Sequence, residues 1–200
     1  EIKQPNIIFI TTDEVEEKTV LKVTDYELSF DEVLLKDVNF EIKSTDKVAI
    51  VGANGAGKTT LFQTIFNNNN SSIEINENIK IGYLSQLQGQ TLNYSNTIAD
   101  EFFDIGFKTY DDIKEYLEGY NFDEESLNQK IGTLSGGEKN LIQLAKISEV
   151  WADLLLLDEP TSHLDTYSQI ALEKAIKNYK GAILMVSHDY YTIANCMDYV

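Results

Sequence analysis

The stretch VGANGAGKTTLFQTIF, residues 51–66, places three glycines and a lysine between an apolar segment and a helical pattern. The preceding residues KVAIV are typical of a buried strand. The apolar side chains after the glycines recur at the spacing of one helix face: Leu61, Phe62, Ile65 and Phe66. Glycine adopts positive φ and carries no Cβ, so this loop can turn its N–H groups inward around an anion. The stretch therefore predicts a strand, an anion-binding loop and a helix in direct succession.

The same letters fit the pattern G-x-x-x-x-G-K-[ST], which fixes Gly52, Gly57, Lys58 and Thr59. With glycine at about 7% of residues, a chance match in a chain of this length arises roughly once in a hundred. We expect Lys58 to contact the β- and γ-phosphate oxygens of ATP, and the Thr59 hydroxyl to bind Mg²⁺. The residues expected to hold ATP in this loop are Gly52, Asn54, Gly55, Ala56, Gly57, Lys58, Thr59 and Thr60.

A second motif, DLLLLDEP, supplies the acidic groups that nucleotide hydrolysis requires. Asp158 and Glu159 follow an apolar strand, and ligands of open parallel sheets bind at the carboxyl ends of strands. Asp158 is the candidate Mg²⁺ ligand, and Glu159 is the candidate general base for the attacking water. Taken alone, the pair could simply open a turn before Pro160, but beside the glycine loop the catalytic interpretation is favoured.

Apolar strands alternate with amphipathic helices along most of the chain, which predicts an α/β fold with a parallel sheet flanked by helices. The expected fold class is a P-loop NTPase (RecA-like) core with an antiparallel β subdomain and a small inserted helical lobe. We expect the segments 72–75 and 79–84 to pair as a hairpin, and the helical lobe to cover about 87–133. Residues 1–20 are expected to be an N-terminal strand or linker, and 21–200 a single ATP-binding domain.

Composition narrows the possible environments and partners. The formal net charge is −17 and the 16 basic residues are all lysines, so no bidentate guanidinium contact with nucleic acid is available. We therefore expect no direct nucleic-acid patch. One cysteine, Cys196, excludes an internal disulfide, and no apolar run reaches the roughly 18 residues of a transmembrane segment. These features predict a cytoplasmic location, and the abrupt ends suggest a fragment of a longer, two-domain protein.

The letters LSGGE, residues 134–138, lie between the expected helical lobe and the LLLLDEP strand. In this order the motifs resemble those of the nucleotide-binding domain of the ABC ATPase superfamily, and the resemblance covers roughly residues 20–200. It implies that Ser135, Gly136 and Gly137 face the γ-phosphate of an ATP molecule bound to a second domain. The implied active form is thus a sandwich of two such domains, in tandem or as a homodimer.

The remaining family motifs match at single positions. The resemblance implies that Gln86 in YLSQ contacts Mg²⁺ and transmits the position of the helical lobe. It implies that Asp165 in SHLD crosses the domain interface, and that His188 in VSHD holds the γ-phosphate and orients the base. Phe30 in ELSF matches an aromatic residue that stacks on adenine, with Tyr26 as an alternative.

Glutamate follows LSGG here, where ATPase subunits of transporters usually show glutamine. The segments LSGGEK, LLLLDEPTSHLD and GAILMVSHDY are similar to those of the ABC-F class. That class implies a soluble protein with two ATPase domains that acts on the ribosome, in translation or in antibiotic resistance. The alternative is the ATP-binding subunit of an ABC membrane transporter, which would need a groove in the helical lobe for a coupling helix. A binding module without activity is disfavoured because the expected hydrolytic residues are present.

Overall fold

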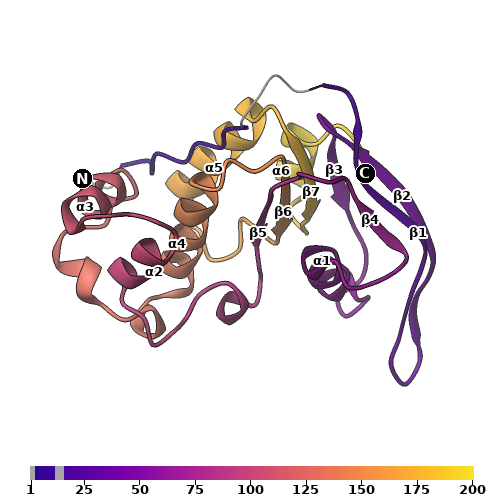
Figure 1. Ribbon diagram of the computed structural model, residues 1–200, viewed down its shortest axis with the longest axis horizontal. Helices are drawn as coiled ribbons and strands as arrows, with labels where there is room; N and C mark the ends of the chain where they lie inside the picture. The colour runs from indigo at the N-terminus through magenta and orange to yellow at the C-terminus, as the bar shows by residue number, and fades with distance from the viewer. Residues whose placement is uncertain (1–2, 12–15) are drawn as a thin grey trace.

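The computed structural model describes residues 3–11 and 16–200, and its centre is a parallel four-stranded sheet (Figure 1). The strand order is β3-β7-β6-β5, and all three pairings are parallel. The bounds are β3 Lys47–Ile50, β5 Ile81–Leu84, β6 Leu154–Asp158 and β7 Ala182–Val186. Every residue of β6 and β7 is buried, as expected for strands that are covered on both faces.

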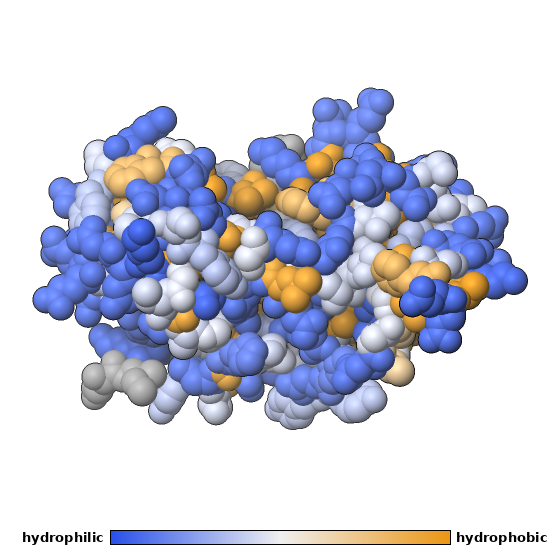
Figure 2. Space-filling model, turned by 90° about the horizontal axis from the view of Figure 1, so that it is seen from below, coloured by the Kyte–Doolittle hydropathy of each residue, from blue (hydrophilic) through white to orange (hydrophobic). Residues whose placement is uncertain are grey.

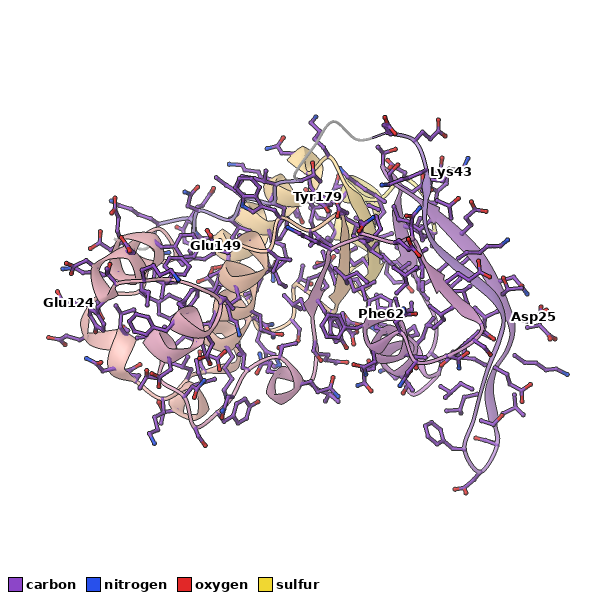
Figure 3. The ribbon with its side chains drawn as sticks, in the orientation of Figure 1. Asp25, Lys43, Phe62, Glu124, Glu149 and Tyr179 are labelled. Carbon is purple, nitrogen blue, oxygen red and sulfur yellow. The ribbon has the colours of Figure 1, made fainter. Side chains whose placement is uncertain are left out.

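A second, antiparallel sheet packs beside the first, with the order β2-β1-β4. Its strands are β1 Thr19–Ser29, β2 Val33–Lys43 and β4 Ile73–Ile75. The long β1–β2 hairpin forms one end of the molecule, and the helical lobe forms the other, as the labelled Asp25 and Glu124 mark in Figure 3. The parallel sheet lies between them. The predicted fold class, a P-loop type α/β core with an antiparallel β subdomain and a helical lobe, is confirmed.

The helices begin where the sequence offers caps. Thr97 and Ser135 each form a capping box, and their side chains accept the backbone N–H three residues later. The core helices are α1 Lys58–Asn67, α4 Gly136–Ser148, α5 Thr166–Asn178 and α6 Tyr190–Cys196. The lobe contains α2 Ile98–Asp104 and α3 Tyr110–Glu118, with the 3₁₀ turns η1 Gln88–Gln90, η2 Glu125–Asn128 and η3 Ile131–Thr133.

The strand β6 divides the interior into two apolar clusters. Leu154 and Leu156 join α1 and the antiparallel sheet, where Phe62 is fully buried. Leu155 and Leu157 point to the other face and join the lobe, α4 and α5. Because side chains alternate across a strand, one run of four leucines fills both clusters. The sheet therefore connects the two ends of the molecule through its own side chains.

The expected hairpin of residues 72–75 and 79–84 is wrong. β4 pairs with β1 in the antiparallel sheet, whereas β5 pairs with β6 in the parallel sheet. The physical reason lies in the burial of β5, since Gly82, Tyr83 and Leu84 are all buried in succession. Such a continuous apolar run is typical of a parallel strand with both faces covered, and not of a half-exposed hairpin.

The helix face predicted for α1 also needs one correction. Leu61, Phe62 and Ile65 are buried, but Phe66 is 45% exposed. Phe66 lies in the last turn, where its ring packs against Tyr83 at a centroid distance of 5.1 Å. The ring of Phe66 thus lies at the rim of a hollow.

Residues 3–11 form no strand, yet they pack on the domain. Ile7 and Phe9 are buried in the cluster of the lobe, and the Asn6 N–H donates to the Gly119 carbonyl at 2.6 Å. Of the predicted strand or linker, residues 1–2 and 12–15 lie outside the described part. None of the described helices is both long and apolar enough to cross a bilayer. The face in Figure 2 is mainly hydrophilic, with separate apolar patches.

Candidate functional site

The glycine loop joins β3 to α1 and depends on two left-handed residues. Gly55 has φ 77° and Gly57 has φ 86°, a region that residues with a Cβ seldom adopt. Gly57 also packs closely, since a Cβ placed there would lie 2.5 Å from Cδ2 of Leu28. Both the backbone angle and the close approach therefore require glycine at position 57, which is the residue immediately before α1.

Lys58 bends back over this loop from the first turn of α1. Its Nζ donates to the carbonyl oxygens of Gly52 at 2.6 Å and Ala53 at 2.7 Å, and the side chain is largely buried. The ammonium group is thus held at the mouth of the loop by backbone acceptors. The N-terminus of α1 adds its partial positive charge at the same place. Together they form a local cationic site in a strongly acidic chain.

Asp158 lies at the carboxyl end of β6, opposite Thr59. The Thr59 hydroxyl donates to Oδ2 of Asp158 at 2.7 Å, and the carboxylate is fully buried. Burial raises the pKa of Asp158 above its usual range, and the hydrogen bond from Thr59 opposes that shift. The other oxygen, Oδ1, is buried and makes no hydrogen bond to any described residue. A buried oxygen without a donor is suited to a cation.

These oxygens fit Mg²⁺, which prefers a few hard oxygen ligands and retains phosphate and water as the others. Within residues 3–11 and 16–200, no group of three His, Cys, Asp or Glu side chains could hold a metal ion by itself. A cation at Asp158 and Thr59 would therefore depend on a bound phosphate for further ligands. Gln86 lines the same pocket and adds a third candidate oxygen.

We expect Asp158→Asn to stabilise the protein in the absence of metal while removing its response to Mg²⁺. The raised pKa of Asp158 means that the folded state disfavours the carboxylate, so stability falls as pH rises through the folded pKa. Asparagine keeps the shape without the charge, so the free energy of unfolding at pH 7 should rise by about 1 kcal/mol. Thermal unfolding with and without Mg²⁺ and ATP measures both effects. A variant that is less stable without metal, or still responds to Mg²⁺, contradicts this prediction.

Glu159 follows Asp158 and turns its carboxylate toward His188. Oε1 of Glu159 contacts Nδ1 of the His188 ring, and Oε2 accepts the His188 backbone N–H at 3.3 Å. The backbone of Glu159 has φ 51°, and its N–H donates to the Val186 carbonyl at 2.8 Å. Such a left-handed residue costs of order 1–3 kcal/mol and persists where surrounding contacts impose it. The pair brings together two residues that are 29 positions apart.

The predicted residues converge on one pocket of about 240 Å³ at the carboxyl ends of the parallel strands. From the predictions, the lining contains Phe30, Asn54, Gly55, Ala56, Gly57, Lys58, Thr59, Thr60, Gln86, Asp158, Glu159 and His188. Phe30 lies in the turn between β1 and β2 and is 70% exposed, whereas the alternative, Tyr26, is buried. Leu34 and Val186 also line the pocket and were missed. The strand-end position of Val186 was the available signal.

The other predicted residues lie elsewhere. Ser135 caps α4 through reciprocal hydrogen bonds with Glu138, at 3.1 and 3.0 Å. Asp165 caps α5 by accepting the Ser168 N–H at 2.7 Å. A Cβ on Gly137 would lie 2.5 Å from the His163 carbonyl oxygen, so the start of α4 packs tightly on the loop before α5. The remaining members of the predicted set are Gly136, beside His163, and Gly52, beneath Lys58. Gly52, Ser135, Gly136, Gly137 and Asp165 are thus absent from this pocket's lining.

The sequence of this chain is similar to those of known proteins. A family model described as "ABC transporter" matches residues 35–162. The chain is 35% identical over 189 residues to ABC transporter F family member 5 of Arabidopsis thaliana, covering 92% of this chain and 27% of that protein. It is 34% identical over 180 residues to the energy-dependent translational throttle protein EttA of Escherichia coli strain K12, covering 85% and 32% respectively.

The solved structures agree with the fold. A dimeric ATP-binding cassette, solved in a post-hydrolysis state with ADP and Pi, superposes with a TM-score of 0.71 at 20% identity. The match covers 90% of this chain and 94% of that one. At such identity the likeness establishes the architecture alone. The chain spans only 27% and 32% of the lengths of these two curated relatives, so it corresponds to only a part of each.

Proposed function

Since the chain belongs to the ABC transporter family of ATP-binding domains and ABC-F proteins are among its relatives, we propose that it binds and hydrolyses ATP within an ABC-F type protein. The observation that carries this proposal is the convergence of the glycine loop, Asp158 and the Glu159–His188 pair on one pocket. The glycine loop follows β3, Asp158 and Glu159 lie at the end of β6, and His188 follows β7. Their chemistry corresponds to phosphate binding, metal binding and water activation.

In the proposed reaction, backbone N–H groups of residues 54–59 and the Lys58 ammonium hold the β- and γ-phosphates. Glu159 accepts a proton from the attacking water, and His188 orients the Glu159 carboxylate through their mutual contact. Phe30 is exposed at the pocket edge, where it can stack on adenine. Mg²⁺, held by Thr59, Asp158 and Gln86, would neutralise charge on the phosphate oxygens.

The signature residues support a two-domain site. Ser135, Gly136 and Gly137 lie at the N-terminus of α4, outside the pocket of their own chain. A helix N-terminus with glycine N–H groups attracts anions. We propose that this surface closes over ATP bound to a second ATP-binding domain, in tandem or in a homodimer. The isolated chain should then bind nucleotide and hydrolyse it slowly unless it dimerises.

A role on the ribosome is the finer part of the proposal. It rests on the resemblance to the ABC-F class and on EttA, whose name assigns it to translation. The acidic, arginine-free composition of this chain gives no basis for direct nucleic-acid contact, so such contacts would come from other parts of the full-length protein. Co-sedimentation of the full-length Glu159→Gln variant with ribosomes in ATP tests this role. Persistent absence from the ribosome pellet, with membrane proteins recovered instead, would argue against it.

One observation favours the alternative, an ATP-binding subunit of an ABC membrane transporter. A mainly apolar hollow of about 280 Å³ lies between the lobe and the core, and Phe66, Tyr83 and Ile105 are among its lining residues. A coupling helix of a membrane subunit would need such a groove. Genes that encode membrane subunits beside this one would support transport, whereas a second ATP-binding domain in the same polypeptide would support the ABC-F proposal.

A further inference from the structure

Two buried amide side chains of α4, Asn140 and Gln143, contact loops from distant parts of the sequence. Gln143 is 2% exposed, and its Oε1 accepts the Ser85 backbone N–H at 3.1 Å. Its Nε2 donates to the Ser85 carbonyl at 3.2 Å. Ser85 directly precedes the pocket residue Gln86. α4 therefore binds both the N–H and the carbonyl of Ser85 through the side chain of Gln143.

The same network continues toward the signature glycines. Nε2 of Gln143 also donates to Oδ1 of Asn140 at 3.1 Å, and Asn140 Nδ2 donates to the Ser162 carbonyl at 2.6 Å. The Gln88 amide donates both to Asn140 at 2.7 Å and to the Gly136 carbonyl at 2.8 Å. One set of side chains thus joins the loop of Gln86, the start of α4 and the loop after Glu159.

Every hydrogen-bonding position of the Gln143 side-chain amide is occupied. Thr91 Oγ1 donates to Oε1 at 2.5 Å, so two donors reach the amide oxygen and two acceptors face the amide nitrogen. An apolar residue of similar size would fill the same space without the cost of burying an amide. Buried, fully satisfied networks of this kind fix one arrangement of the segments that they join. Such a network positions the segments that it joins more than it stabilises the fold.

We propose that Gln143 is a positioning residue that sets Gln86 over the nucleotide pocket. This inference rests on the proposed function, because the place of Gln86 matters when the pocket takes ATP and Mg²⁺. Gln143 itself does not line the pocket. It acts through Ser85, so its replacement should change how the site responds to Mg²⁺ and leave the glycine loop intact.

The test is Gln143→Met, measured by fluorescence titration of the chain with mant-ATP, once with Mg²⁺ and once with EDTA. Affinity in EDTA should stay within about two-fold of the parent, because the glycine loop is unchanged. The gain in affinity on adding Mg²⁺ should fall by about ten-fold, the scale of one lost hydrogen-bonding position. Ser148→Ala is the matched control, because Ser148 is buried in the same helix and bonds Tyr120 and the Leu144 carbonyl instead. It should leave the Mg²⁺ response unchanged.

An unchanged Mg²⁺ response in Gln143→Met, or an equal loss in Ser148→Ala, would overturn this inference but leave the proposed function standing. A parent chain that binds no mant-ATP would overturn the proposed function as well. If Gln143→Met does not fold, Thr91→Val replaces it, since it removes one donor to Gln143 from a half-buried position. The Mg²⁺ gain should then fall by about three-fold, and a parental response would overturn the inference.

Discussion

Replacing Glu159 with glutamine should reduce ATP turnover by roughly 10²–10⁴-fold while ATP binding persists, because the change removes a general base and little else. The amide keeps the size of the carboxylate and can still meet the His188 ring, with which Oε1 of Glu159 is in contact. It cannot accept the proton of an attacking water. Single-turnover hydrolysis and equilibrium nucleotide binding, measured on one preparation that contains both halves of the site, separate the two effects.

Glu149→Gln provides the control for this prediction. Glu149 is exposed at the C-terminal end of α4, far from the pocket, so the same chemical change there should leave turnover within about two-fold of the parent. Hydrolysis by Glu159→Gln at the parental rate would show that another group accepts the proton. Loss of nucleotide binding together with turnover would instead show that the pocket had been distorted.

The sequence predicts which residues gather at the pocket better than it predicts the strand pairing that positions them. The glycine loop and Asp158 follow from local motifs, because a few adjacent residues carry the whole geometric requirement. The Glu159–His188 pair came from a family resemblance, since nothing in either segment specifies a partner 29 positions away. The predicted hairpin of residues 72–75 and 79–84 was wrong for the same reason. The residues of β4 and β5 suit a hairpin locally, yet β1 and β6 are their partners.

Asn140 and Gln143 illustrate what a pattern of apolar residues leaves out. The helix is recognisable from its apolar side chains Leu141, Leu144 and Ala145, and this spacing does not mark Asn140 and Gln143 as buried. Asn140 and Gln143 are nonetheless buried, because backbone groups of the facing loops supply hydrogen-bond partners for their side chains. These backbone partners come close to the two side chains only in the folded chain. Tertiary partners therefore decide where a polar side chain lies, and spacing alone does not.

This distinction explains how the two halves of the proposed site are held. The left-handed turns of the glycine loop depend on its own residues, Gly55 and Gly57. The signature surface depends on contacts between loops, as the close approach of Gly137 to the His163 carbonyl demonstrates. Substitutions in the loop should therefore act on nucleotide affinity. Substitutions at the contact between the start of α4 and the loop before α5 should act on closure and turnover.

Lys58→Ala is the substitution that tests the first half most directly. It removes the side-chain cation at the mouth of the glycine loop and should weaken ATP binding by about 10²-fold, the scale of two charge-assisted hydrogen bonds. The stability of the nucleotide-free protein should change by only about 1 kcal/mol. Loss of Lys58 frees the Gly52 and Ala53 carbonyls, which water can reach because both residues are exposed. Isothermal titration with ATP and thermal unfolding without it measure the two quantities.

Lys174→Ala serves as the matched control, because Lys174 lies on α5 and its ammonium contacts the Gln4 side chain at an exposed position. The control removes the same charge from an acidic chain, and at physiological ionic strength a distant charge is screened beyond about 8 Å. ATP affinity should therefore stay within about two-fold of the parent. Equal losses in both variants would mean that overall charge governs nucleotide binding. An unchanged affinity in Lys58→Ala would remove the phosphate-binding role from the loop, and with it the basis for placing ATP in this pocket.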